Sequence, residues 1–267
     1  MEIFKIIKEH IAWRHQIFKL AKADIIKTYS GAALGWSWAV IKPSVTIFVF
    51  WFAFSVGLRT RGPEGYSFFL WLISGMVAWF YISDMWNQGT GAMRKYSYLI
   101  TKMKFPISTI PTFVSISKLV IHLGLLAITI VLFMLAGHMP DKYFMQLPFY
   151  MLLMFLMATG WALFASVMAA MSKDFWNLVK AFSTAIFWLS GIMWDPYSPA
   201  IPYWVKNFLM FNPVTYIVCG YRDSFIYERW FFEQPLLLAI FLGEMIIMWM
   251  FAIWAYKKLK EDLPDVL

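Results

Sequence analysis

Apolar side chains are concentrated in six long runs of the sequence, and polar and charged side chains gather between them. A helix that crosses a bilayer needs roughly 20 mostly apolar residues, because each residue adds about 1.5 Å and the hydrocarbon core is about 30 Å thick. The pattern therefore predicts an all-α membrane protein with six transmembrane helices. The predicted spans are residues 38–57, 67–90, 107–137, 144–171, 177–195 and 235–256.

A second pattern, with the period of a helix, occupies residues 3–27. Isoleucines and aromatic residues share one broad face and lysines occupy the opposite face, which is typical of an amphipathic helix lying in the membrane surface. Arg14 and Asp24 fall on the apolar side, so we expect both to have protein partners. We therefore predict a cytoplasmic amphipathic interface helix at 1–30, followed by a transmembrane domain at 31–267.

The segment between the fifth and sixth predicted spans, residues 196–234, differs from both a span and an ordinary loop. Its apolar pieces are too short to cross a bilayer, and prolines interrupt them, among them the pair Asn212-Pro213. Irregular backbone is tolerated at membrane depth only where protein buries it or where it lines a water-filled cavity. We therefore favour short re-entrant helices on the outer side over a plain external loop.

Composition agrees with a membrane protein, and the placement of cations indicates its orientation. Hydrophobic residues make up 61% of the chain and charged residues 14%, whereas a soluble domain is typically about 25% charged. With the N-terminus in the cytoplasm, 16 lysines and arginines fall on the inner side and 6 on the outer side. This excess indicates a multi-pass protein of the cell membrane with both termini in the cytoplasm. It also explains the net charge of +8 through contacts with membrane lipids, without a nucleic acid partner.

The sequence lacks the motifs of a catalytic or nucleotide-binding site. It contains no P-loop of the form G-x-x-x-x-G-K-[ST], no Asp-x-Asp pair, and no histidine or cysteine at metal-ligand spacing. We therefore predict no catalysis by this chain and no bound cofactor or metal. Transport against a gradient would draw its energy from an ion gradient or from another subunit.

Ionisable residues inside the predicted spans are few. Lys118 and His122 lie four positions apart in the third span and so share a helix face, while Asp84 lies in the second span and Glu244 in the sixth. Such groups are costly in lipid and must face protein or water. They either line a polar path or gate, or form a structural pair such as Glu244 with Lys118, and they are too sparse for a proton relay.

Aromatic side chains crowd the first and fifth predicted spans. In the middle of a span they either fill packing and lipid-facing positions or line a path for a sugar polymer, whose apolar C–H faces stack on aromatic rings. Periodicity alone does not choose between these interpretations. The candidate path residues are Trp36, Phe48, Trp51, Phe54, Phe187 and Trp188.

The short segment KYSYLITKMKFP, residues 95–106, links the second and third predicted spans on the cytoplasmic side. It can form a short helix that places aromatic residues and methionine among cations, a composition typical of the core of a protein interface. Two interpretations stay open: a basic loop that faces lipid and solvent, or a helix that docks onto a partner protein.

Four stretches share the pattern of one family: ADIIKTYSGAALGWSWAVIKP, YLITKMKFPISTIP, SKDFWNLVKA and FNPVTYIVCGYRDSF. They resemble the entry motif, the coupling helix, the loop before the fifth span and the external Asn-Pro segment of ABC-2 type polysaccharide-export permeases. The resemblance runs from about residue 10 to the end of the chain. Within the family, GLRTRGPEGYSFFLWLISGMVAWF, KLVIHLGLLAI and QLPFYM are most similar to wall teichoic acid translocation permeases. Lys42 departs from the pattern, in which a neutral polar residue is more common before the proline.

The resemblance implies a homodimer of six-span subunits that works with two copies of a separate ATPase, which binds ATP and Mg. The implied cargo is polyprenyl-pyrophosphate-linked teichoic acid, with O-antigen or capsular polysaccharide as the alternative. Two competing functions are an ion-coupled flippase for lipid-linked oligosaccharides and a membrane enzyme acting on polyprenyl-linked sugars. The implied ATPase-coupling residues are Arg94, Lys95, Tyr96, Tyr98, Leu99, Lys102, Met103, Lys104 and Phe105, with Arg14 and Asp24 of the interface helix. The implied external gate consists of Trp194, Asn212, Pro213, Tyr216 and Arg222.

Overall fold

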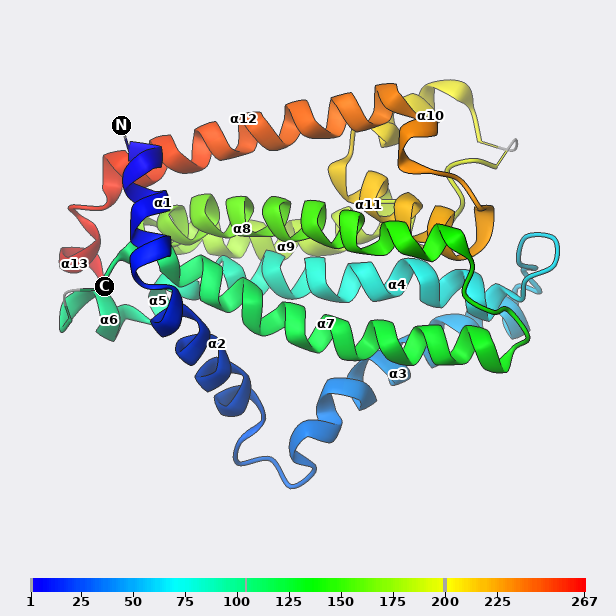
Figure 1. The fold of residues 1–267 in the computed structure, drawn as a ribbon, viewed down its shortest axis with the longest axis horizontal. Coiled ribbons are helices and arrows are strands. Elements are labelled where there is room, and N and C mark those ends of the chain that lie inside the picture. Colours follow the sequence, from blue (N-terminus) through cyan, green and yellow to red (C-terminus); the bar gives the residue numbers. More distant parts are fainter. Residues whose placement is uncertain (1, 104, 199–200) are drawn as a thin grey trace.

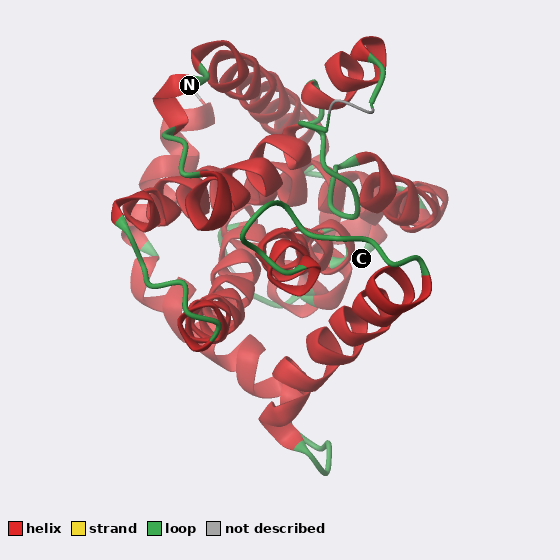
Figure 2. Ribbon diagram, turned by 90° about the vertical axis from the view of Figure 1, so that its right-hand side faces the viewer, coloured by secondary structure: helices red, strands yellow, loops and turns green. Residues whose placement is uncertain are grey.

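The computed structural model describes residues 2–103, 105–198 and 201–267, which form helices joined by turns with no strand among them (Figures 1 and 2). Within these residues, five stretches are long and apolar enough to cross a membrane, and they confirm five of the six predicted spans. The stretches are Gly35–Gly57, Phe68–Gly89, Ile107–Leu135, Lys142–Met171 and Pro235–Leu259. Their main helices are α3 (Trp38–Trp51), α4 (Phe68–Asp84), α7 (Ile110–Leu135), α8 (Leu147–Met171) and α12 (Pro235–Leu259).

The fifth predicted span, residues 177–195, differs from the structure. Helix α9 occupies Lys173–Leu189, so it begins and ends earlier than predicted. Its 17 residues extend about 26 Å at 1.5 Å per residue, less than the hydrocarbon thickness of about 30 Å. The helix ends just before Gly191, which has a φ of 63°, a conformation that glycine adopts without strain. The length of α9 therefore does not establish a sixth crossing.

The two ends of the helical bundle carry different short helices (Figure 1). Both chain termini lie at one end, beside the segment that follows α4. The short helices at this terminal end are α1 (Glu2–Ala12), α5 (Ala92–Lys95), α6 (Ser97–Thr101) and α13 (Leu263–Val266). Toward the opposite end lie α10 (Tyr203–Met210) and α11 (Pro213–Arg222).

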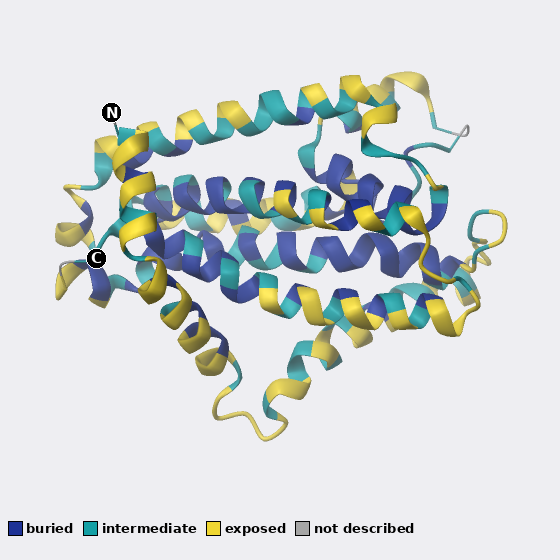
Figure 3. Ribbon diagram, in the orientation of Figure 1, coloured by how far each residue is buried: buried dark blue, intermediate teal, exposed yellow. Residues whose placement is uncertain are grey.

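Helices α4 and α8 form the centre of the bundle, whereas α3 and α12 lie at its periphery (Figure 3). Over the most apolar part of each span, 78% of the span containing α4 is buried but only 6% of the span containing α3. Lipid tails are as apolar as a leucine side chain, so an uncovered apolar helix is stable against them. Helices α3 and α12 therefore present apolar surfaces to lipid or to another protein chain.

The predicted interface helix at 3–27 is divided into two helices. The chain bends at Trp13 (φ −103°, ψ 14°), between α1 and α2 (Arg14–Tyr29). The predicted apolar face is also divided, because Ile17 is buried against the bundle while Phe18 is exposed. The N-terminal helices thus pack on the protein with one side and keep an apolar side available for lipid.

Helices α10 and α11 confirm the short helices predicted between α9 and α12. Asn212 begins α11, since its side-chain oxygen accepts a hydrogen bond from the backbone N–H of Val214 at 2.9 Å, and Pro213 occupies the first turn. Both residue types are favoured at these helix positions. Residues 214–222 are buried, so protein surrounds this interrupted part of the chain, as the membrane setting demands.

Candidate functional site

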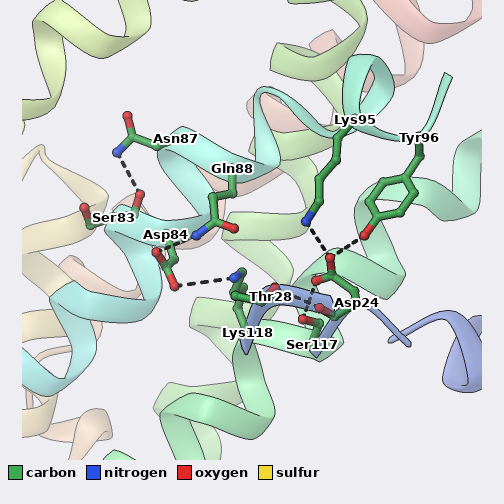
Figure 4. Close-up of polar contacts among 10 residues, drawn as sticks. All are labelled: Asp24, Thr28, Ser83, Asp84, Asn87, Gln88, Lys95, Tyr96, Ser117 and Lys118. Atoms are coloured by element: carbon green, nitrogen blue, oxygen red, sulfur yellow. Dashed lines mark hydrogen bonds and ion pairs between the residues drawn. The ribbon is translucent and has the colours of Figure 1, made fainter. Parts of the chain in front are cut away.

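The carboxylate of Asp24 lies where three segments from distant parts of the sequence meet (Figure 4). Lys95, at the end of α5, donates to its Oδ1 at 2.6 Å, and the Tyr96 hydroxyl donates to the same oxygen. Ser117 of α7 donates to Oδ2 at 2.5 Å. These contacts join α2 both to α7 and to the segment after α4. We call the four residues Asp24, Lys95, Tyr96 and Ser117 the Asp24 cluster.

Burial and hydrogen bonding act in opposite directions on the Asp24 carboxyl group. Burial raises its pKa, whereas hydrogen bonds from Lys95, Ser117 and Tyr96 lower it, and the pKa lies below the ordinary value for aspartate. The group is therefore an ionised carboxylate at neutral pH, held by one cation and two hydroxyl groups. Burial, together with the nearby Asp24 carboxylate, raises the pKa of the Tyr96 hydroxyl, so this hydroxyl stays protonated and remains a donor.

Arg94 fastens the segment after α4 to the end of α8. Its Nε donates to the carbonyl oxygen of Ala169 at 2.7 Å, and its Nη2 donates to that of Ala170 at 2.8 Å. The last carbonyls of a helix have no partner within the helix and carry the negative end of its dipole, so an arginine suits them in both respects. Arg94, one of the implied ATPase-coupling residues, is thus anchored within its own chain.

The predicted docking residues of this segment divide into buried and exposed ones. Tyr96 and Leu99 are only 4% and 3% exposed, and the Tyr96 ring packs edge-on against Phe113 with centroids 4.8 Å apart. Tyr98 and Met103 are 43% and 56% exposed. The chain's own helices therefore already bury Tyr96 and Leu99, whereas Tyr98 and Met103 are accessible to a partner.

The remaining predicted coupling residues also have different surroundings. Lys102 is exposed, whereas Phe105 is half-buried and packs edge-on against Trp13 with ring centroids 5.3 Å apart. Lys104 lies outside the described residues. Arg14 is exposed and donates to a backbone carbonyl of α1 at 3.5 Å, which leaves its guanidinium accessible. We call Tyr98, Lys102 and Met103 the exposed edge.

Two polar contacts that sequence reasoning missed hold α1 on the bundle. His10 is hydrogen-bonded through Nε2 to the Thr112 hydroxyl of α7 at 2.8 Å. Glu2 forms an ion pair with Lys260 at 2.5 Å, which joins the two terminal regions of the chain. Nothing in the periodicity of the sequence marks these residues, because their partners lie far away along the chain.

The sequence profile of the ABC-2 type transporter family matches residues 15–226, a range that includes the Asp24 cluster, the exposed edge and α11. The chain belongs to the ABC-2 type transporter family. It is similar to the O-antigen export system permease protein RfbA of Myxococcus xanthus, with 21% identity over 92% of this chain and 94% of that protein. It is also similar to the polysialic acid transport protein KpsM of Escherichia coli, with 22% identity over 72% of this chain and 73% of that protein. A second O-antigen export permease, from Klebsiella pneumoniae, is 20% identical over 93% of both chains.

The ABC-2 permease brings four of its six predicted path aromatics together in two groups. Phe187 of α9 is buried and stacks on Phe50 of α3, with ring centroids 5.3 Å apart, and Trp188 packs edge-on against the same Phe50 ring. Phe48 and Trp51 line a groove between α3, α4 and α7 instead. Phe50 belongs to the aromatic run of the first span but is not among the candidate path residues, because no single ring stands out in a run that is almost continuous.

The other two predicted path residues lie at opposite ends of the first span. Trp36 stacks on Tyr29 at the end of α2, with ring centroids 5.3 Å apart. Phe54 stacks on Phe68 at the start of α4, with centroids 6.0 Å apart. These contacts fix the two ends of α3 to neighbouring helices, so both residues have a packing role whether or not they meet a polymer.

Both ends of α11 hold the turn at residues 189–192, which follows α9. Asn212 donates from Nδ2 to a backbone oxygen of this turn at 3.1 Å. Arg222, which is fully buried, donates from Nη1 and Nη2 to two further backbone oxygens of the turn at 2.5 and 2.6 Å. Its guanidinium also lies over the Trp71 ring, 3.6 Å from the centroid. The predicted gate residues Asn212 and Arg222 thus hold α9, α11 and α4 together. We call the contacts of Arg222 with this turn and with Trp71 the lock.

The remaining predicted gate residues lie beside this lock. Tyr216 is buried and stacks on Phe241 of α12, with ring centroids 4.8 Å apart. Trp194 donates from its indole N–H to the backbone oxygen of Trp188 at 2.7 Å. It also lines a cavity of about 540 Å³, together with Phe54 of the first span. Of the predicted gate residues, Trp194 is therefore the one that borders open space near the end of the first span.

The ionisable groups of the spans pair differently from the sequence-based expectation. Lys118 Nζ lies 3.8 Å from Asp84 Oδ2, so the suggested pair of Glu244 with Lys118 is wrong; α7 packs against α4. His122 shares a cavity with Lys118, as their helical spacing predicted, and is hydrogen-bonded to the Tyr221 hydroxyl at 2.8 Å. Among the described residues, Oε2 of Glu244 has no hydrogen-bond partner.

Proposed function

We propose that this chain is the membrane subunit of an ATP-driven exporter that moves a lipid-linked polysaccharide from the cytoplasm to the outer side of the cell membrane. The family match and the names of the relatives support a polysaccharide cargo. Because the chain has no P-loop, ATP and Mg belong to a separate subunit. The observation that carries the mechanism is the Asp24 cluster, which links the segment bearing the exposed edge to two helices of the bundle.

The exposed edge is the docking site for a P-loop ATPase in this proposal. Tyr98 and Met103 supply the apolar anchors, and Lys102 lies at the rim, where a charge contributes less than a buried anchor does. A displacement of α6 reaches Tyr96 and Lys95 through the chain, and through Asp24 it reaches α2 and α7. Since it is costly to leave the buried Asp24 carboxylate without its partners, the cluster moves as one unit.

The assembly is proposed to be a homodimer with two ATPase copies, and both termini lie in the cytoplasm. The span containing α3 is only 6% buried over its most apolar part, which supports a place for it at a subunit interface or a polymer path. The first span and α9 of both copies line that path, with Trp51 and Trp188 among the rings that meet the polymer. The cavity beside Trp194 and the lock at Arg222 form its outer end.

The favoured cargo is polyprenyl-pyrophosphate-linked teichoic acid, and O-antigen or capsular polysaccharide is the alternative. The resemblance of residues 57–80 and 146–151 to teichoic acid permeases supports the first, whereas the names of the relatives support the second. Cations at the terminal end suit the pyrophosphate of either cargo. Export assays with a labelled poly(polyol phosphate) and with a neutral polysaccharide, each on its lipid carrier, decide between them.

The proposal is tested by purifying a tagged chain from its native membrane in mild detergent. We expect a roughly equimolar P-loop ATPase to accompany the wild-type chain and to be lost from the double variant Tyr98→Ala/Met103→Ala. The matched control is Tyr203→Ala/Met145→Ala, which removes an exposed tyrosine and an exposed methionine toward the opposite end of the bundle. A chain that purifies without an ATPase in all three preparations would overturn the proposal and favour an ion-coupled flippase.

A further inference from the structure

Two neighbouring cavities lie between the first span, α4 and α7. The larger has a volume of about 620 Å³ and extends to the end of α2, and the smaller has a volume of about 210 Å³. They share the lining residues Pro43, Phe80 and Leu125, so they lie next to each other and follow one line along α3, α4 and α7. We call the two together the α3–α7 groove.

One end of the α3–α7 groove is polar and carries more positive than negative charge. Lys42 and Lys118 line it, and Asp84 is the one acidic side chain among the described lining residues. The Lys118 side chain is only 1% exposed, and its Nζ lies 3.8 Å from Asp84, beyond hydrogen-bond distance. Gln88 donates to the other oxygen of that carboxylate at 2.9 Å. The Lys118 ammonium group therefore retains donors for an anion inside the groove.

The other end of the groove is apolar. Ile47, Phe48 and Trp51 of α3 face Ile73 of α4 and Leu132 of α7 across it. Apolar surface of this kind is stabilised by a hydrocarbon chain, which the surrounding bilayer supplies. An anion-binding end that continues into a hydrocarbon-binding end matches the structure of a phospholipid.

The order of the two ends along the bundle also matches a phospholipid in a bilayer. The polar end contains Asp84, at the last turn of α4, and Tyr29, at the end of α2. It therefore lies nearer the end of the bundle that carries both termini (Figure 1). The apolar end is lined along α4 from Phe80 to Phe69, in the first turn of that helix, so it extends through the spans toward the opposite end of the bundle.

We propose that an anionic phospholipid of the bilayer occupies the α3–α7 groove, with its phosphate between Lys42 and Lys118 and one acyl chain along Phe48 and Trp51. The lipid is a resident component, separate from any exported cargo. All the lining residues belong to one chain. The contact of Phe50 with α9 lies outside the groove, so a lipid in the groove leaves that contact intact. By filling the space beside the sparsely packed first span, the lipid holds α3 against α4 and α7.

The test uses the complete assembly purified in mild detergent, with bound lipids counted per chain by mass spectrometry after delipidation and addition of phosphatidylglycerol or phosphatidylcholine. We expect about one phosphatidylglycerol per chain and a higher apparent melting temperature with that lipid than with phosphatidylcholine. Lys42→Gln should lower its retention about fivefold, the effect of one cation near a membrane surface. Lys27→Gln is the control, because Lys27 is exposed and does not line the groove.

A second variant tests the apolar end without touching the cations. Ser44 lines this end and is exposed, so Ser44→Phe fills the groove while the chain still folds, and it should also lower phosphatidylglycerol retention. Equal retention by the wild-type chain, Lys42→Gln and Ser44→Phe would overturn the proposal. Retention of both phospholipids without preference would also overturn it, as would recovery of a polyprenyl phosphate in the groove instead of a bilayer phospholipid.

Discussion

The ammonium group of Lys95 lies 2.6 Å from the carboxylate of Asp24, although 71 positions separate the two residues in the sequence. The pair connects the segment after α4 to the N-terminal helices, and Ser117 extends the connection to α7. A buried carboxylate fixed in this way is costly to separate from its cation. The contact therefore makes the N-terminal helices, the exposed edge and a central span respond together to a displacement of any one of them.

Replacing Lys95 with Met should destabilise the permease more than replacing both members of the pair. Lys95→Met leaves the buried Asp24 carboxylate without a cation, and we expect a loss of about 2–3 kcal/mol, reduced by the partial exposure of the Lys95 side chain. Adding Asp24→Asn removes the unpaired charge and should recover part of this loss. Apparent melting temperatures of the two single variants and the double variant measure the coupling. Strictly additive losses would contradict the pairing.

Gly75 of α4 should not tolerate a methyl group, because a Cβ atom there would lie 2.7 Å from Nη2 of Arg222. The Arg222 guanidinium is held by the turn after α9 and by Trp71, so it cannot retreat. We expect Gly75→Ala to cost about 2 kcal/mol through overpacking. Gly124→Ala in α7 is the control, since no atom outside its own turn lies within 4 Å of the added Cβ. Equal melting temperatures for the two variants would contradict the lock.

Asp223, at the end of α11, should make the stability depend on pH. Burial raises its pKa to about 7 from an ordinary value of 3.8. Between these two values the folded chain binds a proton that the unfolded chain has lost, so stability falls as the pH rises through this range and is constant above it. Melting temperatures measured from pH 4 to pH 8 should show this slope in the wild type and in Glu261→Gln, an exposed control. If the melting temperature of Asp223→Asn still falls over this pH range, a titratable group other than Asp223 causes the pH dependence.

Phe187 and Trp188 are neighbours in the sequence but should respond differently to truncation. Phe187 is buried between Phe50 and Trp79, so Phe187→Ala should cost about 3 kcal/mol of stability. Trp188 is 43% exposed, so Trp188→Ala should lower stability by much less than Phe187→Ala and slow export several-fold if the ring meets the polymer. Normal export by a stable Trp188→Ala variant would remove this residue from the path.

Local patterns were sufficient to predict much of the fold. The lengths of the apolar runs predicted six spans, of which the structure confirms five, and the prolines with Asn212 indicated the short helices before α12. The predicted extent of α9 was wrong at its end, because the turn after Leu189 is stabilised by Arg222 and Asn212 from outside the helix. An apolar run alone does not show where such a contact ends a helix.

Less of the candidate site followed from the sequence. The unusual position of Asp24 on an apolar face indicated a protein partner, but not that Lys95 and Ser117 of the same chain supply it across 71 and 93 positions. Tyr96 and Tyr98 look alike in the sequence, yet one is buried and the other exposed. Only the packing of α6 against the bundle distinguishes them.

The central claim is that the Asp24 cluster transmits ATPase movement to the bundle. It is tested most directly by the amount of polymer exported per ATP hydrolysed in proteoliposomes containing the whole assembly. In the double variant Asp24→Asn/Lys95→Met, the exposed edge is intact, so the ATPase should still bind and hydrolyse ATP. We predict that the export ratio nevertheless falls at least tenfold relative to the wild type. An unchanged ratio in a variant that keeps its ATPase would contradict the claim.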